Sequence, residues 1–512
     1  MFIFPLIQRT YRLIRTAWAV KALRQADSDD VKQQARHALS EILAGSRGLP
    51  MKVGQVLAGM GDTSEYAALT QSIEPWSLKK MLPVLAQAWG KPPLMILESI
   101  EESHAAASLG QVHRAKLNAR ETLAIKIQYP DIAKAMQAEM TLAGLMPAAG
   151  PAKTWDFDMQ AYKQAFNQNI HEELDYLHEM KQQMLFSASI HVQGLHVPTT
   201  YPWLCRKNIL VQSWAAGVRL SEVAKWSLPD RLFVARTLMQ TMFQSLFQAG
   251  LVHGDPHPGN MLFSNDGKEP QTTLLDFGCM IHIDEMPRLA LLNMILVARG
   301  DRHINLLPLF ASMGFDESKL HYIEAKLPTL IQLLCRPFME ERAFDVEQWD
   351  VSASVELLLG DDKWWFRSAA PAKLFLIIRI FQGLLSQLAL LDVKLPWFPL
   401  LQQALKQSTW EDAKHWTPKG IHLPEPPEVQ GSATQLSIHI QPHGKNDINI
   451  TLTAVSALDL ENLMPETIAS DMRDAGVHLS DIREKLLKEG LEPQTLLDLE
   501  MPSYHCHIAL LS

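Results

Sequence analysis

The sequence predicts an α+β fold, and three observations carry this prediction. Short strand-like runs gather between residues 108 and 129, and residues 285–410 have helical spacing almost throughout. A further group of strand-like and helical runs follows residue 431. Strands and helices that are grouped in this way along a chain are typical of α+β proteins.

The composition is that of an ordinary globular protein. Of the 512 residues, 47% are hydrophobic and 20% are charged, which excludes a disordered or fibrous chain. The 30 prolines and 25 glycines follow no short period, which excludes a collagen-like or low-complexity protein. The length is typical of about three domains. Because the net charge is −9, we expect no nucleic-acid partner.

The first half of the chain is predicted to place strands between helical segments. Residues 27–100 have helical spacing, with breaks at glycine and proline. Residues 110–115 and 123–129 are predicted strands that are joined by a turn. Helical spacing returns over residues 131–192, and residues 208–214 have the apolar run of a buried strand.

The second half begins with a predicted apolar helix over residues 229–250 and a short strand at 273–275. The long helical stretch 285–410 follows. The proline-rich run 423–428 then marks the boundary of a further part of the chain.

Residues 431–512 are predicted to form a small acidic α+β module. Alternating apolar residues predict a hairpin over 436–452 and a final strand over 504–510. Ser480 is the predicted N-cap of a helix that ends before Gly490. Twelve acidic and five basic residues give the module a net charge of −7. Two interpretations are open for it: packing against the rest of the protein, and binding of a partner.

Cysteine usage and hydropathy favour a cytoplasmic protein. The four cysteines are far apart and form no C-x-x-C pair, which is typical of a reducing compartment. We expect neither a secretory signal nor a membrane-spanning helix, because basic residues interrupt the apolar runs. The nearest candidate, residues 371–391, carries Lys373 and Arg379 and is predicted to be a buried helix.

Residues 1–25 are predicted to form a basic amphipathic helix. They contain five basic residues and no acidic residue. Ile7, Tyr11, Ile14 and Trp18 fall on one stripe at helical spacing. Two interpretations are open. The helix lies on an anionic membrane surface, which would make the protein peripheral on the inner face of a membrane, or the stripe packs against the protein's own body.

Three segments occur in an order that phosphoryl transfer explains. The first is the predicted strand that contains Ala-Ile-Lys126. From a strand, the Lys126 amine can reach nucleotide phosphates when a carboxylate orients it. For this residue alone, a solvated lysine on an edge strand is the simpler alternative.

The second segment runs from His253 to Asn260 and reads His-Gly-Asp-Pro-His-Pro-Gly-Asn. The spacing of Asp255 and Asn260 is that of a kinase catalytic loop, in which the aspartate orients a hydroxyl and the asparagine binds a metal. The prolines and glycines predict a rigid loop. A purely structural turn would explain the prolines and glycines but not the other polar residues.

The third segment is Asp276-Phe-Gly278, directly after a predicted apolar strand. A carboxylate in this place can bind Mg²⁺ that bridges nucleotide phosphates. Each segment alone is weak evidence, but the three in this order predict a kinase-like site. We therefore expect ATP or ADP and Mg²⁺ as cofactors, with Asn260 and Asp276 as the metal ligands.

Further motifs resemble those of the UbiB/AarF family of atypical kinases. Lys52-Val-Gly-Gln55 is similar to the family's K-x-G-Q motif, and Glu173-Leu-Asp175 to its E-x-D motif. The family's H-x-D-P-H-P-G-N run is complete at residues 253–260. Its alanine-rich loop, which replaces a glycine-rich one, is matched by Ala105, Ala106, Ala107, Ser108, Leu109, Gly110 and Gln111. The resemblance covers roughly residues 45–400.

The resemblance implies a protein-kinase-like two-lobe fold with additions at both ends. The expected parts are an N-terminal helical extension (1–100), an N-lobe (101–215), a largely helical C-lobe (216–420) and the small α+β module (431–512). The extension is expected to fold over the site and to block a peptide substrate. Lys52 and Gln55 would then point inward and meet the E-x-D acids.

The resemblance and the motif chemistry together assign roles to the site residues. We expect Lys126 to bind the α- and β-phosphates and Asp255 to position a water or hydroxyl nucleophile. Glu173 is the expected carboxylate partner of Lys126 or Lys52. Glu172 and Glu179 are the alternatives, because helix spacing allows more than one choice.

The remaining expected contacts involve the alanine-rich loop and two histidines. Ala105, Ala106, Ala107 and Ser108 are expected to contact the nucleotide together with Lys52 and Gln55. Three alanines stiffen such a loop compared with glycines. His253 is expected to hydrogen-bond backbone near Asp276-Phe-Gly278, and His257 to structure its own loop.

One segment departs from the family's pattern. Between the lobes the family has a methionine–glutamate pair before a glycine, whereas this chain has Val211-Gln-Ser-Trp-Ala-Ala-Gly217. Main-chain groups bind adenine there, so nucleotide binding is still expected. A ribose contact from a glutamate is put in doubt.

The favoured function is an ATP- and Mg²⁺-dependent atypical kinase or ATPase. The resemblance implies that it supports ubiquinone or another isoprenoid-lipid pathway, with lipid- or quinone-pathway proteins as partners. One alternative is a small-molecule phosphotransferase of the aminoglycoside or choline kinase kind, which shares H-G-D-x-H-x-x-N but lacks K-x-G-Q and the alanine-rich loop. The other is a nucleotide-binding pseudokinase scaffold. The phosphoryl acceptor and the oligomeric state stay open.

Overall fold

The computed structural model describes the chain from residue 75 onward, with gaps. The described residues are 75–106, 109–134, 136, 172–255, 258–418, 429–442, 448–464, 466–502 and 504–512. Several predicted features lie outside them, namely the helix over 1–25, Lys52, Gln55, Ala107, Ser108, His257 and the linker 423–428. The described residues divide into two compact units. One contains those up to His282 together with Leu376–Leu395, and the other contains Ile283–Phe375 and Pro396–Ser512.

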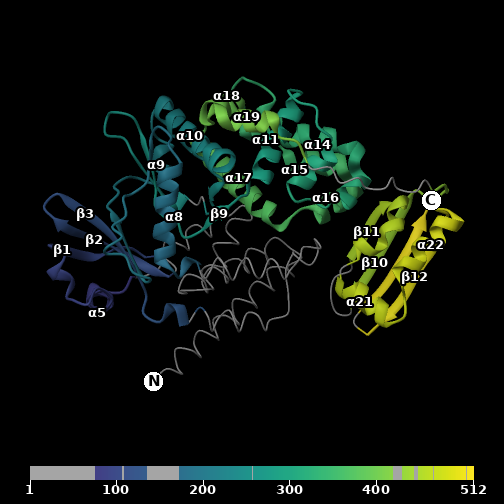
Figure 1. Ribbon diagram of the computed structural model, residues 1–512, viewed down its shortest axis with the longest axis horizontal. Coiled ribbons are helices and arrows are strands. Elements are labelled where there is room, and N and C mark those ends of the chain that lie inside the picture. The colour runs from purple at the N-terminus through teal and green to yellow at the C-terminus, as the bar shows by residue number, and fades with distance from the viewer. Residues whose placement is uncertain are drawn as a thin grey trace. The chain divides into compact units, whose positions relative to one another are not determined.

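The first unit contains a four-stranded antiparallel sheet. Its strands are, in spatial order, β1 (Ser99–Ala106), β2 (Gly110–Asn118), β3 (Glu121–Gln128) and β5 (Ile209–Ser213). Figure 1 labels the first three of them. The strands that the sequence predicts at 110–115, 123–129 and 208–214 are confirmed. Asn118 closes the β2–β3 turn, because its side-chain oxygen accepts hydrogen bonds from the backbone N–H groups of Arg120 and Glu121.

Strand β1 corrects the expectation that Ala105 and Ala106 lie in a loop. Ala105 pairs with Val112 and Ala106 with Gln111, so both alanines belong to the end of the strand. The reason is that β2 extends back to Gly110 and offers its backbone groups to these alanines. Such pairing depends on the neighbouring strand more than on the intrinsic preference of alanine.

Two helices of the first unit matter for the site. Helix α5 (Leu78–Trp89) buries Met81 and Leu85 in one core with Leu123 and Ile125 of β3. This part of the expected extension over 1–100 therefore packs as a component of the sheet's own core. Helix α8 (Tyr176–Ser189) begins after Asp175, whose side chain accepts hydrogen bonds from two backbone N–H groups of the first turn.

The first unit also contains helix α9 (Leu220–Val223) and helix α10 (Leu228–Phe243), which continues as the π-helical segment Gln244–Ala249. Gly250, with φ 63°, ends it, so the helix predicted over 229–250 is confirmed. Short strands then frame the motif loop. Strand β6 (Leu251–His253) pairs with β9 (Met280–His282), and β4 (Leu195–His196), β8 (Gln271–Leu274) and β7 (Met261–Ser264) form a second small sheet.

Helix α17 (Ala372–Leu391) confirms the helix that is predicted over 371–391. From Ile377 onward it buries one face, which includes Ile380, Leu384 and Leu388. Within the described residues, no helix is long and apolar enough to span a bilayer.

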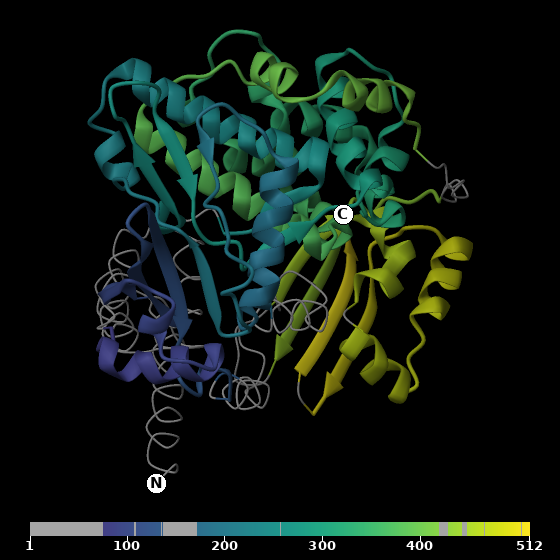
Figure 2. The same cartoon turned by 60° about the vertical axis from the view of Figure 1, so that its left-hand side comes forward.

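The second unit joins a helical part to a C-terminal sheet. The helices of the helical part are α11 (Glu285–Arg299), α12 (Leu306–Ser312), α13 (Glu317–Leu320), α14 (Leu327–Leu334), α15 (Val351–Leu359), α16 (Lys363–Ala369), α18 (Trp397–Ala404) and α19 (Gln407–His415). The sheet has the antiparallel order β11 (Ile448–Thr453), β10 (Gln435–Pro442), β13 (Tyr504–Leu511), β12 (Gln494–Met501). Helices α20 (Leu460–Leu463), α21 (Glu466–Asp474) and α22 (Leu479–Glu489) connect β11 to β12 and lie along the sheet (Figures 1 and 2).

The C-terminal sheet confirms the predicted hairpin and final strand, and it corrects one cap. Helix α22 begins at Leu479 and has His478 as its N-cap, so Ser480 lies inside the helix. Leu479 is 5% exposed, whereas Ser480 faces solvent. The helix thus starts two residues earlier than the capping pattern indicates, and its first residue, Leu479, is buried.

One aromatic cluster joins the two parts of the second unit. The rings of Tyr322 and Trp365 stack at 4.1 Å, and Trp365 Nε1 donates a 3.0 Å hydrogen bond to the buried Ser456 Oγ. The C-terminal module therefore packs against the helical part, as the simpler of the two interpretations of the module expects.

Candidate active site

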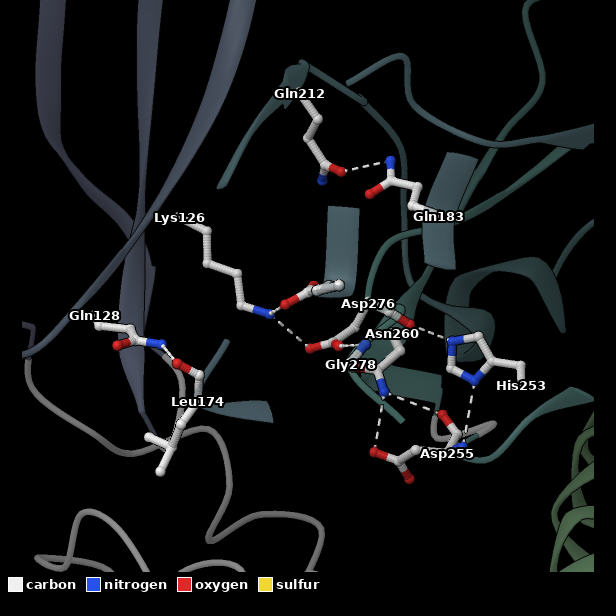
Figure 3. A network of polar contacts seen from close by, with 11 residues as sticks. Lys126, Gln128, Leu174, Gln183, Gln212, His253, Asp255, Asn260, Asp276 and Gly278 are labelled. Atoms are coloured by element: carbon white, nitrogen blue, oxygen red, sulfur yellow. Dashed lines mark hydrogen bonds and ion pairs between the residues drawn. The ribbon is translucent and has the colours of Figure 1, made fainter. Parts of the chain in front are cut away.

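Lys126 is the centre of the candidate site. It lies on β3, between β2 and β5. Its Nζ donates hydrogen bonds to Glu179 Oε1 at 2.9 Å and to Asp276 Oδ2 at 3.0 Å (Figure 3). One amine thus connects a strand of the sheet, helix α8 and the Asp276-Phe-Gly278 segment.

The charges of this cluster stabilise one another against burial. The Lys126 side chain is 18% exposed and that of Glu179 is 1% exposed. Burial alone would lower the pKa of Lys126, but the carboxylates of Asp276 and Glu179 outweigh it and raise this pKa well above the ordinary value. Burial raises the pKa of Glu179 to about 7, against the lowering effect of Lys126.

The carboxylate beside Lys126 belongs to Glu179, which corrects the expectation that Glu173 pairs with Lys126. Glu173 precedes the N-cap Asp175 and is therefore outside α8, whereas Glu179 lies in its first turn. Glu173 is still part of the site, since a Cβ on Gly278 would lie 3.6 Å from its Cγ. Glu179 is one of the alternatives that helix spacing leaves open. A pair between Glu173 and Lys52 stays a prediction.

The catalytic-loop residues Asp255 and Asn260 are brought together as their spacing predicts. Asn260 Nδ2 donates to the backbone carbonyl of Asp255 and to its Oδ2, both at 3.1 Å. The backbone of Asn260 also accepts a 3.0 Å hydrogen bond from Leu275 N, just before Asp276. Figure 3 shows Asn260 between Asp255 and Asp276.

His253 links the catalytic loop to the Asp276-Phe-Gly278 segment, as predicted. Its Nε2 contacts the backbone carbonyl oxygen of Asp276, and its Nδ1 accepts a 3.3 Å hydrogen bond from Asp255 N. Since a carbonyl can only accept, Nε2 is the donor in its contact with Asp276. His253 therefore fixes Asp255 and Asp276 relative to each other.

The Asp276-Phe-Gly278 segment is held from both sides. Asp276 Oδ1 accepts a 3.0 Å hydrogen bond from Gly278 N, while its Oδ2 faces Lys126. Phe277 is fully buried and packs against the rings of Phe186 and His253, with centroid distances of 5.3 and 5.6 Å. The carboxylate is thereby presented at the cluster with 39% of its side chain exposed.

Gly110 lies in the alanine-rich segment and permits a close approach of β2 to β3. A Cβ at this position would lie 2.3 Å from the Ile127 carbonyl oxygen and 2.9 Å from Tyr176 Oη. Any other residue would push β2 away from β3 and α8. Position 110 therefore requires a glycine, because β2 lies close to β3 and to Tyr176 of α8 there.

Gln111, the last residue of that motif, anchors the chain that leads into α5. Its Oε1 accepts a hydrogen bond from Trp76 N and its Nε2 donates one to Trp76 O, both at 2.8 Å. Nε2 also lies 2.9 Å from His113 Nε2. This buried clamp is a contact that sequence reasoning missed, because it joins residues 35 positions apart.

Arg219 is a second residue that the motifs did not reveal. Its Nη1 donates to the backbone carbonyls of Gly259 at 2.7 Å and Met261 at 3.2 Å. These carbonyls lie on either side of Asn260. Arg219 therefore holds the backbone from which the expected metal ligand projects.

In the segment that departs from the family's pattern, the glutamine is Gln212, and its side chain makes a buried hydrogen bond within the protein. Gln212 is 9% exposed, and its Oε1 accepts a 2.8 Å hydrogen bond from Gln183 Nε2 of α8. Gln212 therefore fastens β5 to α8.

Comparison with known proteins shows what the chain is similar to. Residues 68–303 match the family model of the ABC1 atypical kinase-like domain. An aarF domain-containing protein kinase of Arabidopsis thaliana is 29% identical over 243 residues, which are 45% of this chain and 33% of that protein. A probable protein kinase UbiB of Actinobacillus pleuropneumoniae is 28% identical over 247 residues, which are 44% of this chain and 45% of that protein. The matches thus span about a third to a half of these relatives.

One solved structure shares the fold of this chain. A Mycobacterium tuberculosis protein, solved in complex with erythromycin, superposes with a TM-score of 0.50 and 23% identity, over 73% of this chain and 97% of its own. The resemblance to the UbiB/AarF family and the α+β, kinase-like fold are therefore confirmed. Over residues 68–303 the chain is thus similar to the ABC1 atypical kinase-like domain, and in sequence it is similar to proteins named AarF and UbiB kinases.

Proposed function

We propose that the chain binds ATP with Mg²⁺ around Lys126 and transfers the γ-phosphoryl group, as an atypical kinase or an ATPase. The observation that supports this best is the contact of Lys126 Nζ with Glu179 at 2.9 Å and with Asp276 at 3.0 Å. Kinases place nucleotide phosphates with a strand lysine that a helix carboxylate orients, next to a metal-binding aspartate. The raised pKa of Lys126 keeps the amine charged for this task.

The oxygen atoms of the site fit a magnesium ion. Mg²⁺ prefers a few protein oxygens together with water and phosphate oxygens. Asp276 presents a partly exposed carboxylate, and Asn260 directs its Nδ2 at Asp255, which leaves the amide oxygen for a metal. Bound Mg²⁺ would neutralise charge on the phosphates. In the described part of the chain, no three histidine, cysteine or acidic residues form a metal site by themselves.

Asp255 is the proposed group that orients the nucleophile. The hydrogen bond from Asn260 at 3.1 Å fixes its carboxylate. The nucleophile is a water or a hydroxyl, whose oxygen bonds to the γ-phosphorus while the bond to the β–γ bridging oxygen breaks. Its proton passes to the Asp255 carboxylate, and ADP leaves with the bridging oxygen.

The pathway is a proposal that rests on the family alone. We infer that the activity serves ubiquinone or another isoprenoid lipid, and that residues 1–25 bring the protein to an anionic membrane surface. Deletion of the gene followed by quinone lipid profiling tests the pathway. An unchanged profile would reject it, whatever the result for nucleotide turnover.

ADP release from the purified full chain tests the activity itself. The rate is measured with MgATP in the presence and absence of anionic liposomes. Asp276→Asn should abolish the release, because it removes the carboxylate charge that holds the metal. Asp266→Asn, an exposed aspartate in the β7–β8 turn, is the matched control and should behave as wild type. An Asp276→Asn variant as active as wild type contradicts the proposal.

The ADP-release assay, combined with a measurement of MgATP binding, also distinguishes the pseudokinase scaffold and the small-molecule phosphotransferase from the proposed function. Binding of MgATP without ADP release, both with and without liposomes, indicates a pseudokinase scaffold. Release that depends on an added small hydroxylated acceptor indicates a small-molecule phosphotransferase.

A further inference from the structure

Tyr176 lies inside the candidate site, and none of the roles given above involves its side chain. It is the first residue of α8 and is 1% exposed. Lys126 Nζ lies 4.9 Å from the centre of its ring. The ring therefore lies beside the amine that is proposed to bind nucleotide phosphates.

The hydroxyl of Tyr176 is buried and has no hydrogen-bond partner in the described part of the chain. A buried hydroxyl in this condition destabilises the protein, because it has lost its water and gained nothing in exchange. Phenylalanine would fill the same space without that penalty. A tyrosine in this place is therefore explained best by a partner that joins the hydroxyl during function.

The position of the hydroxyl indicates what that partner is. The oxygen lies at the start of β2, where a Cβ on Gly110 would come within 2.9 Å of it. The hydroxyl is thus directed at the point where the alanine-rich segment enters β2, while the ring lies against Lys126. In the kinase arrangement, nucleotide phosphates lie between this loop and the strand lysine.

We propose that the Tyr176 hydroxyl donates a hydrogen bond to a phosphate oxygen of the bound Mg²⁺-nucleotide. This inference rests on the proposed function and adds a phosphate-binding residue to it. Burial raises the pKa of Tyr176, so the phenol keeps the proton that it donates. Because the oxygen is covered, the contact requires the backbone at Gly110 to move outward when the nucleotide enters.

The substitution Tyr176→Phe tests this proposal by two measurements, the melting temperature without nucleotide and the Kd for nucleotide. Without nucleotide, the variant should melt at the same temperature as wild type or higher, because it loses only an unpaired hydroxyl. With nucleotide, its Kd for MgADP and MgATP should rise about tenfold or more, as expected for one hydrogen bond to a charged acceptor. The Kd for adenosine, which has no phosphate, should not change.

Tyr201→Phe is the matched control. The Tyr201 hydroxyl contacts Glu121 Oε1 at 3.2 Å on the same sheet. This variant should melt at the same temperature as wild type or lower and should bind MgADP like wild type. Its behaviour shows whether the loss of any hydroxyl near the sheet changes nucleotide affinity.

A second measurement leaves the side chain in place. A 3-fluorotyrosine is incorporated at position 176, and its ¹⁹F resonance should shift with MgADP but not with adenosine. Equal MgADP affinities of wild type and Tyr176→Phe, or an unmoved resonance at saturating MgADP, overturn the inference alone. A wild-type chain that binds no nucleotide overturns the proposed function and this inference with it.

Discussion

Lys126 Nζ lies 3.0 Å from Asp276 Oδ2, although 150 residues separate the two along the chain. The same amine contacts Glu179, so one cation holds together β3, α8 and the segment that follows β8. Under the proposed function, phosphates and metal compete with the contact to Asp276, whereas the contact to Glu179 persists. The contact between Lys126 and Glu179 therefore stabilises the fold whether or not a nucleotide is bound.

Lys126→Met should destabilise the protein strongly. It leaves the Glu179 carboxylate, which is 1% exposed, without its main counter-charge. Loss of one partner of a buried pair lowers the free energy of unfolding by about 3–5 kcal/mol. Urea unfolding followed by tryptophan fluorescence measures it. The double variant Lys126→Met/Glu179→Leu should regain most of the loss, and a double variant as unstable as the single one would contradict this account.

The pKa of Glu179 predicts how stability changes with pH. Burial raises this pKa to about 7 in the folded chain, whereas in the unfolded chain it is near its ordinary value of 4.5. Between these values the folded state binds more protons than the unfolded state, so the free energy of unfolding falls as the pH rises. Unfolding at pH 5 and pH 8 should show this fall for wild type, and a smaller one for Glu179→Gln. If the free energy of unfolding fell equally in wild type and Glu179→Gln between pH 5 and pH 8, Glu179 would have an ordinary pKa.

Arg219→Lys should weaken metal use more than it weakens the fold. A lysine keeps the charge but loses the guanidinium fork that reaches the carbonyls on either side of Asn260. The Mg²⁺ concentration for half-maximal ADP release should rise about threefold to tenfold, as for a lost hydrogen bond.

Arg236→Lys on the exposed side of α10 is the control for this variant and should leave the Mg²⁺ dependence unchanged. Should Arg219→Lys lower the melting temperature without moving the Mg²⁺ dependence, the arginine would be a stabilising residue only.

Gln111→Glu should break the clamp on Trp76. The introduced carboxylate oxygen would face the Trp76 carbonyl oxygen, to which Gln111 Nε2 now donates at 2.8 Å. Two buried acceptors facing each other should lower the free energy of unfolding by about 1–3 kcal/mol. Gln403→Glu on the exposed side of α18 is the matched control for the added charge. Equal unfolding curves for the two variants would mean that the clamp adds no stability.

Patterns confined to short stretches of sequence were predictable. The spacing of Asp255 and Asn260 and the apolar strand before Asp276 reflect local geometry, and the structure reproduces both. The hairpin of β2 and β3 and the helix over α10 likewise follow from alternation and helical spacing. These features need only the backbone of a few neighbouring residues.

Tertiary packing decided the rest, because contacts between distant residues depend on where whole elements begin. Helix α8 starts at Tyr176, so the acid turned toward Lys126 is Glu179, 53 residues away, while Glu173 lies before the cap. Pairing with β2 drew Ala105 and Ala106 into a strand. The burial of the Tyr176 hydroxyl, which has no hydrogen-bond partner among the described residues, results from the approach of α8 to Gly110. The sequence by itself thus determined which chemical groups the site has, and only packing decided which of them meet.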